Sequence, residues 1–414
     1  MKRNADGRKA DGKEKKRFRR RDPARALLSA VMVFFFLAFL LLALKDGSWE
    51  CVLLALAVPA LIFVGTAGIP KLFPADKLLL SLTNFLCALG VLVLYRLSPE
   101  RGLTQAVNYG VGVAAMLVCI LLVRYIKDWK WLSLLMMAGS FLMLALPLLI
   151  GEKRNGARNW ISVGGYSMQP SELVKLALLL SISYWLARRK VVFSVAFVGG
   201  CLLLLMLQED LGTALLYYGA TLVLLYAATG SLPLMGYQMF AHVKRRVAIW
   251  LNPWADMDGS GYQIVQSLIA IVNGGAWGVG LGLGNASVIP EYYNDFIFSV
   301  ILHEFGMIFG LIVVCMYLFI TIRGVMIARR SRTAFHALLA TGCAALIALQ
   351  AFVIIGGNIK LIPLTGVTLP FISYGGTSMV SSLCVIGLLQ GVASCNEAGV
   401  HADRALAMQG GDLK

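Results

Sequence analysis

Residues 261–306 have the sequence GYQIVQSLIAIVNGGAWGVGLGLGNASVIPEYYNDFIFSVILHEFG, and they interrupt a very apolar chain with glycines and polar side chains. Asp295 stands near the end of this stretch, directly before the apolar run that begins at Phe296. A carboxylate at such a water–membrane edge is poorly hydrated, and poor hydration makes it a stronger base. The stretch therefore predicts a non-cytoplasmic loop that carries chemistry. An aspartate that caps the following helix is the other interpretation of the same residue.

The remaining sequence predicts an all-α polytopic membrane protein of 11–12 transmembrane segments with a large outer loop. Hydrophobic residues make up 59% of the 414 residues and charged residues 14%, which excludes an ordinary soluble domain. Apolar runs of about 20 residues fit membrane-spanning helices, and they lack the alternation of a membrane β-barrel. The candidate spans are 27–44, 51–66, 78–97, 105–125, 131–150, 172–187, 191–207, 212–229, 296–322, 336–356 and 376–394.

Basic residues set the expected orientation, because positive charges gather on the cytoplasmic side of a membrane. Residues 1–25 hold twelve Lys and Arg against four acidic residues, so their net charge of +8 is half of the formal +16. This segment predicts a disordered cytoplasmic tail near anionic lipid, in preference to a nucleic-acid-binding arm. Basic turns at 125–130, 187–190 and 323–332 lie on the same side, which places 151–171 and 357–375 outside.

The same orientation requires one more crossing between residues 230 and 250, which is short for the usual span of about 20 residues. Either this crossing thins the bilayer locally, or 212–229 is re-entrant, or the chain has lost part of a helix. The predicted organisation is a basic cytoplasmic tail (1–25), an extra N-terminal transmembrane hairpin (26–77), a membrane domain (78–395) whose outer loop spans about 250–295, and a second cytoplasmic tail (396–414).

Two charged residues stand inside apolar surroundings. Lys175 follows the helix-opening sequence Pro170-Ser-Glu, and Asp210 lies between two apolar runs. Charges at membrane depth are expensive and usually pair or serve a site. We therefore predict an ion pair between Lys175 and Asp210, either structural or part of a functional site. Upstream of them, Arg158 beside Trp160 fits either a phosphate contact or an interfacial anchor.

Two further segments are rich in polar residues, glycine and proline. Residues 262–272 have helical spacing with a polar edge, and the glycine-rich loop after them matches no nucleotide-binding fingerprint. Residues 357–378 hold two prolines and several glycines, and irregular backbone at membrane depth survives only beside protein or a water-filled cavity. The candidate substrate-binding residues of all these clusters are Arg158, Gln263, Gln266, Ser267, Glu291, Lys360 and Ser373.

The sequence predicts no metal site. Eight cysteines are scattered through apolar runs without a C-x-x-C pair, and no acidic cluster has clear metal-binding spacing. We expect the thiols to be buried and to pack as small apolar side chains.

Taken together, the polar clusters resemble the SEDS family, the RodA, FtsW and SpoVE peptidoglycan polymerases. The resemblance covers residues 78–395 and rests on five motifs that follow one another in the family's order. The matching segments are GARNWISVGGYSMQPSELVKLA, QEDLGTALL, GYQIVQSLIAI with GG two residues later, PEYYNDFIFSVILHEFG and IPLTGVTLPFISYGGTS.

The resemblance implies a SEDS-type helical bundle and a glycosyltransferase that polymerises lipid II on the outer face of the bacterial cytoplasmic membrane. Asp295 falls on the family's essential acid, the general base, while Lys175, Asp210 and Glu172 fall on residues that support the active site. The implied products are a glycan strand and undecaprenyl pyrophosphate, for cell division, elongation or sporulation. The implied partner is a class B penicillin-binding protein. No particular cofactor is implied, although a divalent cation, Mg or Mn, would suit the pyrophosphate leaving group.

Two other functions are compatible with these features. A flippase or transporter of lipid-linked precursors shares buried charges and broken helices, but the sequence shows no internal repeat and its polar residues cluster on one side. A non-catalytic scaffold for division or elongation is favoured by the short crossing near 230–250. Further departures from the family pattern are Glu209 in place of proline, Tyr293-Asn294 in place of His-Thr, and two extra spans before residue 78.

Overall fold

The computed structural model describes residues 23–154, 157–163, 166–230, 247, 249–256, 261–285 and 288–411. The helices are α2 (Pro23–Asp46), α3 (Trp49–Phe63), the π-helix η1 (Val64–Gly68), α4 (Ile69–Leu72), α5 (Lys77–Leu97), α6 (Pro99–Tyr125), α7 (Lys130–Ile150), α8 (Pro170–Ala187), α9 (Val191–Leu207), α10 (Leu211–Thr229), the 3-10 helix η2 (Pro253–Asp256), α12 (Tyr262–Gly274), α13 (Ile297–Arg329), α14 (Ala334–Asn358) and α15 (Gly376–Gly411).

All eleven predicted spans coincide with helices, which confirms the helical membrane fold. In the part of the chain that the structure describes, nine helices are long and apolar enough to cross a membrane, and the apolar α9 is shorter, with 17 residues. The remaining predicted span is α8, whose 18 residues include the buried Lys175. Most of the predicted short crossing at 230–250 lies outside the described residues.

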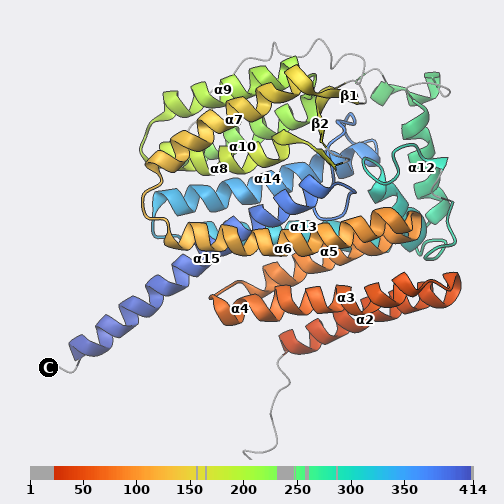
Figure 1. Cartoon of the computed structure of the whole chain (residues 1–414), viewed down its shortest axis with the longest axis horizontal. Helices are drawn as coiled ribbons and strands as arrows, with labels where there is room; N and C mark the ends of the chain where they lie inside the picture. Colours follow the sequence, from red (N-terminus) through yellow and green to blue (C-terminus); the bar gives the residue numbers. More distant parts are fainter. Residues whose placement is uncertain are drawn as a thin grey trace, which may run out of the picture.

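The β-strands, α12 and the polar loops gather at one end of the bundle, called here the cavity end. Figure 1 places β1, β2 and α12 together at this end, and the C-terminal part of α15 projects from the other. The basic connections α6–α7, α8–α9 and α13–α14 also lie at that other end (Figure 1). The polar loops and the basic turns are therefore separated by the length of the bundle, as their sequences predict.

Close approach between α6 and α15 fixes the centre of the bundle. A Cβ atom added at Gly387 of α15 would lie 2.6 Å from Met116 O, and one added at Gly112 of α6 would lie 2.4 Å from Leu383 Cδ1. Helices in membranes associate by such small-residue contacts because lipid removes most of the hydrophobic driving force. The mostly buried helices α5 and α15 then form the frame on which the cavity end is built.

A small antiparallel sheet crosses the loop between α7 and α8, where the sequence predicted only a loop. Its strands are β1 (Glu152–Arg154), β2 (Ala157–Val163) and β3 (Tyr166–Met168), with β2 in the middle. The segment Trp160–Val163 is rich in aromatic and β-branched residues, which favour a pleated, half-buried strand. Arg158 N donates a hydrogen bond to Gln208 O over 2.8 Å, so the sheet is attached to the turn before α10.

The N-terminal hairpin formed by α2 and α3 packs specifically on the bundle. Buried Asn84 of α5 donates to Thr66 Oγ1 over 2.9 Å and accepts from Tyr109 OH over 2.7 Å. Thr66 belongs to η1, so the π-helical turn reaches into the bundle. At the cavity end, Lys45 Nζ of α2 donates to Gly282 O of the glycine-rich loop over 3.0 Å.

Asp76 connects three helices at the end of the bundle away from the cavity. Its Oδ1 caps α5 by accepting from Leu79 N over 3.0 Å, and its Oδ2 accepts from Arg323 Nε of α13 over 2.8 Å. Gln390 of α15 bonds to both the amide and the carbonyl of Asp76. One carboxylate thus serves as a helix cap and as the partner of a partly buried guanidinium.

Replacing Asp76 with alanine removes the cap and leaves the Arg323 charge without its partner. We expect a loss of roughly 3 kcal/mol, because breaking a buried ion pair strands the other charge. The melting temperature of the purified protein in detergent measures this loss. Asp128→Ala, at an exposed turn where Oδ1 accepts from Lys130 N, is the control, with an expected change below about 0.5 kcal/mol. Equal melting temperatures for the two variants would contradict the assigned role of Asp76.

Candidate active site

A polar cavity of about 540 Å³ opens at the cavity end, between segments that are far apart in the sequence. Its walls come from β2, α8, the start of α10, the first turn of α12, residues 291–295, α14 and residues 364–368. A volume of this size is typical of ligand pockets. Among the described residues, six charged ones line it: Glu172, Lys175, Glu209, Asp210, Glu291 and Asp295.

Asp295 lies in the irregular turn 291–296 and lines the cavity. The residue that caps α13 is Phe296, with no side-chain cap hydrogen bond. Asp295 is therefore not the cap of that helix, and the structural interpretation of this residue is wrong. Glu291 begins the turn with a φ of 52°, a left-handed conformation that reverses the chain toward the cavity.

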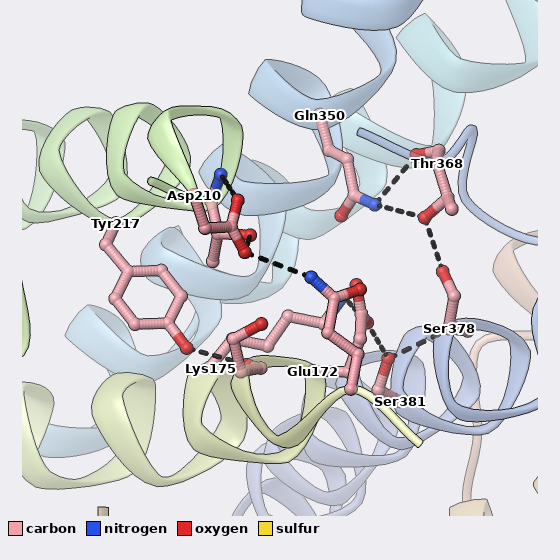
Figure 2. A network of polar contacts seen from close by, with 11 residues as sticks. Glu172, Lys175, Asp210, Tyr217, Gln350, Thr368, Ser378 and Ser381 are labelled. Carbon is pink, nitrogen blue, oxygen red and sulfur yellow. Dashed lines mark hydrogen bonds and ion pairs between the residues drawn. The ribbon is translucent and has the colours of Figure 1, made fainter. Parts of the chain in front are cut away.

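Lys175 forms an ion pair with Glu172, one turn earlier on the same helix α8. Figure 2 shows the two side chains together with Ser381 of α15, whose Oγ donates to Glu172 Oε2 over 2.5 Å. The predicted direct ion pair between Lys175 and Asp210 is wrong in its partner. A carboxylate three residues away on the same helix face is the nearer acceptor for a lysine at this depth.

Asp210 is held by neutral donors instead. Its Oδ2 accepts from Asn159 Nδ2 over 2.8 Å, from Gln169 Nε2 over 3.1 Å and from Thr213 Oγ1 over 2.9 Å. Its Oδ1 caps α10 by accepting from Thr213 N over 3.1 Å. Several hydrogen bonds of this kind stabilise a carboxylate without a cation. Asp210 thus joins the β-sheet, the start of α8 and the start of α10 around one wall of the cavity.

A chain of hydrogen bonds continues from Glu172 to the opposite wall (Figure 2). Ser381 Oγ also donates to Ser378 O over 3.1 Å, and the hydroxyls of Ser378 and Thr368 lie 2.6 Å apart. Gln350 of α14 then donates to Thr368 O over 2.8 Å. This chain links α8, α15, residues 364–368 and α14. Residues 364–368 in turn abut α10, since a Cβ at Gly212 would lie 2.7 Å from Thr365 O.

The predicted substrate-binding residues divide into two groups. Gln263 and Glu291 line the cavity, whereas Arg158 is exposed on β2 next to lining residues. Four residues lie outside the lining, and one of them, Gln266, is half-buried. The other three are bound to other parts of the protein: Ser267 to Ser299 Oγ and Asn358 O, Lys360 to Leu251 O, and Ser373 to Asn294 O.

Sequence reasoning missed three side-chain amides of the cavity. Asn159, Gln169 and Gln350 all line it, and the first two hold Asp210. Gln350 had a usable signal, because a polar side chain in the middle of an apolar membrane helix is expensive unless it has a partner. Asn159 and Gln169 lay within a polar loop, where an amide is not distinctive.

Two departures from the family pattern, at Glu209 and at Tyr293-Asn294, lie next to the site and have structural consequences. Tyr293 stacks under the guanidinium of Arg101, whose Cζ lies 3.6 Å from the ring centroid. Burial, helped by the Glu291 carboxylate, raises the pKa of Tyr293 above its ordinary value, so the phenol stays neutral. Glu209 has a φ of 61°, which a proline ring cannot adopt, and its side chain lies 3.4 Å from Lys153 Nζ on the surface.

The described residues include no group of three or more His, Cys, Asp or Glu side chains that could hold a metal ion. A cation that accompanies the pyrophosphate stays a prediction.

A helical bundle with a polar cavity at one end defines a polytopic membrane protein that can hold a polar ligand at the edge of the lipid. The family model of the FTSW_RODA_SPOVE cell cycle proteins matches residues 76–398. The chain belongs to this family, and the resemblance in its motifs is confirmed. The match begins directly after the N-terminal hairpin.

Individual relatives agree with this assignment. The chain is 34% identical to stage V sporulation protein E of Bacillus subtilis over 355 residues, which cover 77% of this chain and 96% of that protein. It is 32% identical to the peptidoglycan glycosyltransferase RodA of Mycobacterium tuberculosis over 427 aligned positions, which cover 89% of this chain and 90% of that protein.

Solved structures confirm the SEDS-type bundle. A chain from a peptidoglycan synthase complex that coordinates polymerization and crosslinking matches with a TM-score of 0.65 at 27% identity, covering 78% of this chain and 98% of that one. The crystal structure of the rod shape determining protein RodA of Thermus thermophilus matches with a TM-score of 0.59 at 27% identity, with the same coverage of 78% and 98%.

Double-mutant cycles distinguish the observed ion pair from the predicted one. We expect Glu172→Gln and Lys175→Met to be coupled by about 1–3 kcal/mol in unfolding free energy, because each removes the partner of the other. The cycle of Lys175→Met with Asp210→Asn should give less than about 0.5 kcal/mol, since Asp210 has its own donors. Stability curves in detergent measure both cycles, and a larger coupling to Asp210 would overturn the assignment.

Proposed function

We propose that the protein is a peptidoglycan glycosyltransferase that polymerises lipid II into glycan strands at the outer face of the bacterial cytoplasmic membrane. The observation that carries the proposal is Asp295, which lines a polar cavity at the end of the bundle opposite the basic turns. The FtsW and RodA relatives are named as peptidoglycan glycosyltransferases, which supports the same activity here.

The proposed reaction forms one glycosidic bond and breaks one bond to pyrophosphate. The 4-hydroxyl oxygen of the acceptor sugar attacks the anomeric carbon of the lipid-linked donor. Asp295 accepts the proton of that hydroxyl as the alcohol becomes an ether. The electron pair of the broken carbon–oxygen bond leaves with undecaprenyl pyrophosphate, which stays in the membrane.

The charges of the cavity favour the sugar over the pyrophosphate as its main occupant. Five of the six charged residues in its described lining are carboxylates, and the sixth, Lys175, is already paired with Glu172. Carboxylates and amides suit the hydroxyl and acetamido groups of a saccharide, whereas a pyrophosphate would be repelled. We place the pyrophosphate at the cavity mouth, where the exposed Arg158 stays its predicted contact.

The proposed orientation rests on the distribution of basic residues. The connections that carry Lys127, Arg188 and Arg330 lie at the end away from the cavity. Positive charges stay cytoplasmic, so the cavity end faces outward, where lipid II is polymerised. The basic residues 1–25 then belong to the cytoplasmic side, next to anionic membrane lipid. No nucleic-acid partner is proposed.

We further propose a class B penicillin-binding protein as the partner that cross-links the new strand. The similar chain from a synthase complex that coordinates polymerization and crosslinking supports such an assembly. The similar proteins include a stage V sporulation protein and a rod shape determining protein, and we propose a role in cell division, elongation or sporulation.

The test is polymerisation of labelled lipid II by the purified full-length protein, alone and with a class B penicillin-binding protein. We expect glycan strands from the wild type and a rate at least about 100-fold lower for Asp295→Asn, because the amide cannot accept the proton. Asp46→Asn is the matched control, since Asp46 is exposed at the end of α2 and should leave the rate unchanged.

Equal melting temperatures for the wild type and Asp295→Asn would show that the loss is chemical. If the folded wild-type protein, bound to its partner, makes no glycan strands, the proposal that it is a glycosyltransferase is wrong. Movement of labelled lipid II across vesicles would then identify a flippase, and partner binding without movement would identify a scaffold.

A further inference from the structure

The turn that carries Asp295 is held through its backbone by a single distant segment. Three consecutive carbonyl oxygens, those of residues 293–295, each accept a hydrogen bond from within residues 358–374. The three bonds are Tyr374 N to Tyr293 O (2.9 Å), Ser373 Oγ to Asn294 O (2.8 Å) and Asn358 Nδ2 to Asp295 O (2.6 Å). We call this arrangement the carbonyl clamp.

Asn358 is the most constrained member of the clamp. It is 0% exposed, and besides Asp295 O its Nδ2 also donates to Ile354 O over 2.9 Å. Its Oδ1 accepts from Ser299 Oγ over 3.0 Å, and its carbonyl accepts from Ser267 Oγ over 3.2 Å. Every polar group of Asn358 outside the regular helix bonds is thus used, and such a satisfied buried network is rigid.

Ser373 is also anchored on both sides. Its side chain is buried, and its Oγ accepts from Leu369 N over 2.8 Å while it donates to Asn294 O. Its carbonyl accepts from Gln105 Nε2 of α6 over 3.0 Å. The clamp is therefore tied to α6 by one member and to α12, α13 and α14 by the other.

We propose that Asn358 and Ser373 are positioning residues that set where the Asp295 carboxylate points into the cavity. Neither side chain lines the cavity, so neither can contact the sugar. The turn 291–296 has no regular secondary structure, so the hydrogen bonds to its carbonyl groups fix the main chain from which the Asp295 carboxylate extends. The inference rests on the proposed role of Asp295, because a displacement of about 1 Å matters only to a group that takes part in the reaction.

The first test measures kcat and KM for lipid II with the full chain and its partner. Asn358→Ala should lower kcat about 100-fold and change KM less than about 3-fold, because the cavity lining stays and only the base moves. Asn358→Asp should be as slow, since it keeps the acceptor and loses the donor. Ser373→Ala should lower kcat about 10-fold, and Ser373→Thr, which keeps the hydroxyl, should restore it.

A matched control exists at the other end of the bundle. Asn396 is also buried, and its Nδ2 donates to Ile327 O over 3.1 Å. Asn396→Ala removes the same kind of hydrogen bond far from the cavity, so it should lower the melting temperature and leave kcat unchanged. A fall in kcat for Asn396→Ala equal to that for Asn358→Ala would overturn the positioning role.

The second test does not depend on activity. Hydrogen–deuterium exchange of the peptide 291–299 reports the turn directly, because Asn294 N is bonded to Glu291 O inside the turn and Ser299 N is bonded to Asn358 Oδ1. Asn358→Ala should speed exchange in this peptide and Asn396→Ala should not. If the wild type makes no glycan, the proposed function fails, and the exchange result alone then tests whether Asn358 holds the turn. Unchanged hydrogen exchange in Asn358→Ala, or a full kcat in this variant, would overturn the positioning role of Asn358.

Discussion

Polar groups at membrane depth must find partners inside the protein, and this constraint shapes the whole cavity end. Lys175 is only 3% exposed and is neutralised by Glu172 on its own helix. Ser381 of α15 donates a hydrogen bond to Glu172, and further hydroxyl and amide groups extend the hydrogen bonds to α14. Because Glu172 and Gln350 each bond to a group from another element, the helices keep a fixed separation, and the cavity between them is a consequence of that separation.

The irregular segments obey the same constraint. Residues 291–296 and 359–375 both depart from helical geometry. Donors of the second segment, Ser373 Oγ and Tyr374 N, bond to carbonyl groups of the first. Neither segment would be stable alone beside lipid, since free backbone groups there are costly. Their mutual pairing places Asp295 at the cavity without requiring it to cap α13. The backbone is irregular at the turn that brings Asp295, the carboxylate of the proposed reaction, to the cavity.

The sequence predicted the spans well, because the thickness of the bilayer imposes long apolar runs that a helix must fill. It also predicted that Asp295, Glu172, Lys175 and Asp210 would share a site. It failed on the partner of Lys175, because two carboxylates were available and only the fold decides between them. It took Ser267 and Ser373 for ligand contacts, whereas both are used inside the protein. It also missed the strands at 152–168, since a short polar loop gives little periodicity.

The most direct test of this account is a structure of the Asp295→Asn protein in lipid nanodiscs with bound lipid II. We expect the disaccharide in the cavity between α8, α10 and residues 364–368, with a sugar hydroxyl within about 3 Å of the residue 295 side chain. The pyrophosphate should lie at the cavity mouth. A disaccharide bound elsewhere on the bundle, with the cavity empty, would contradict the assignment of this cavity as the place where the glycan strand grows.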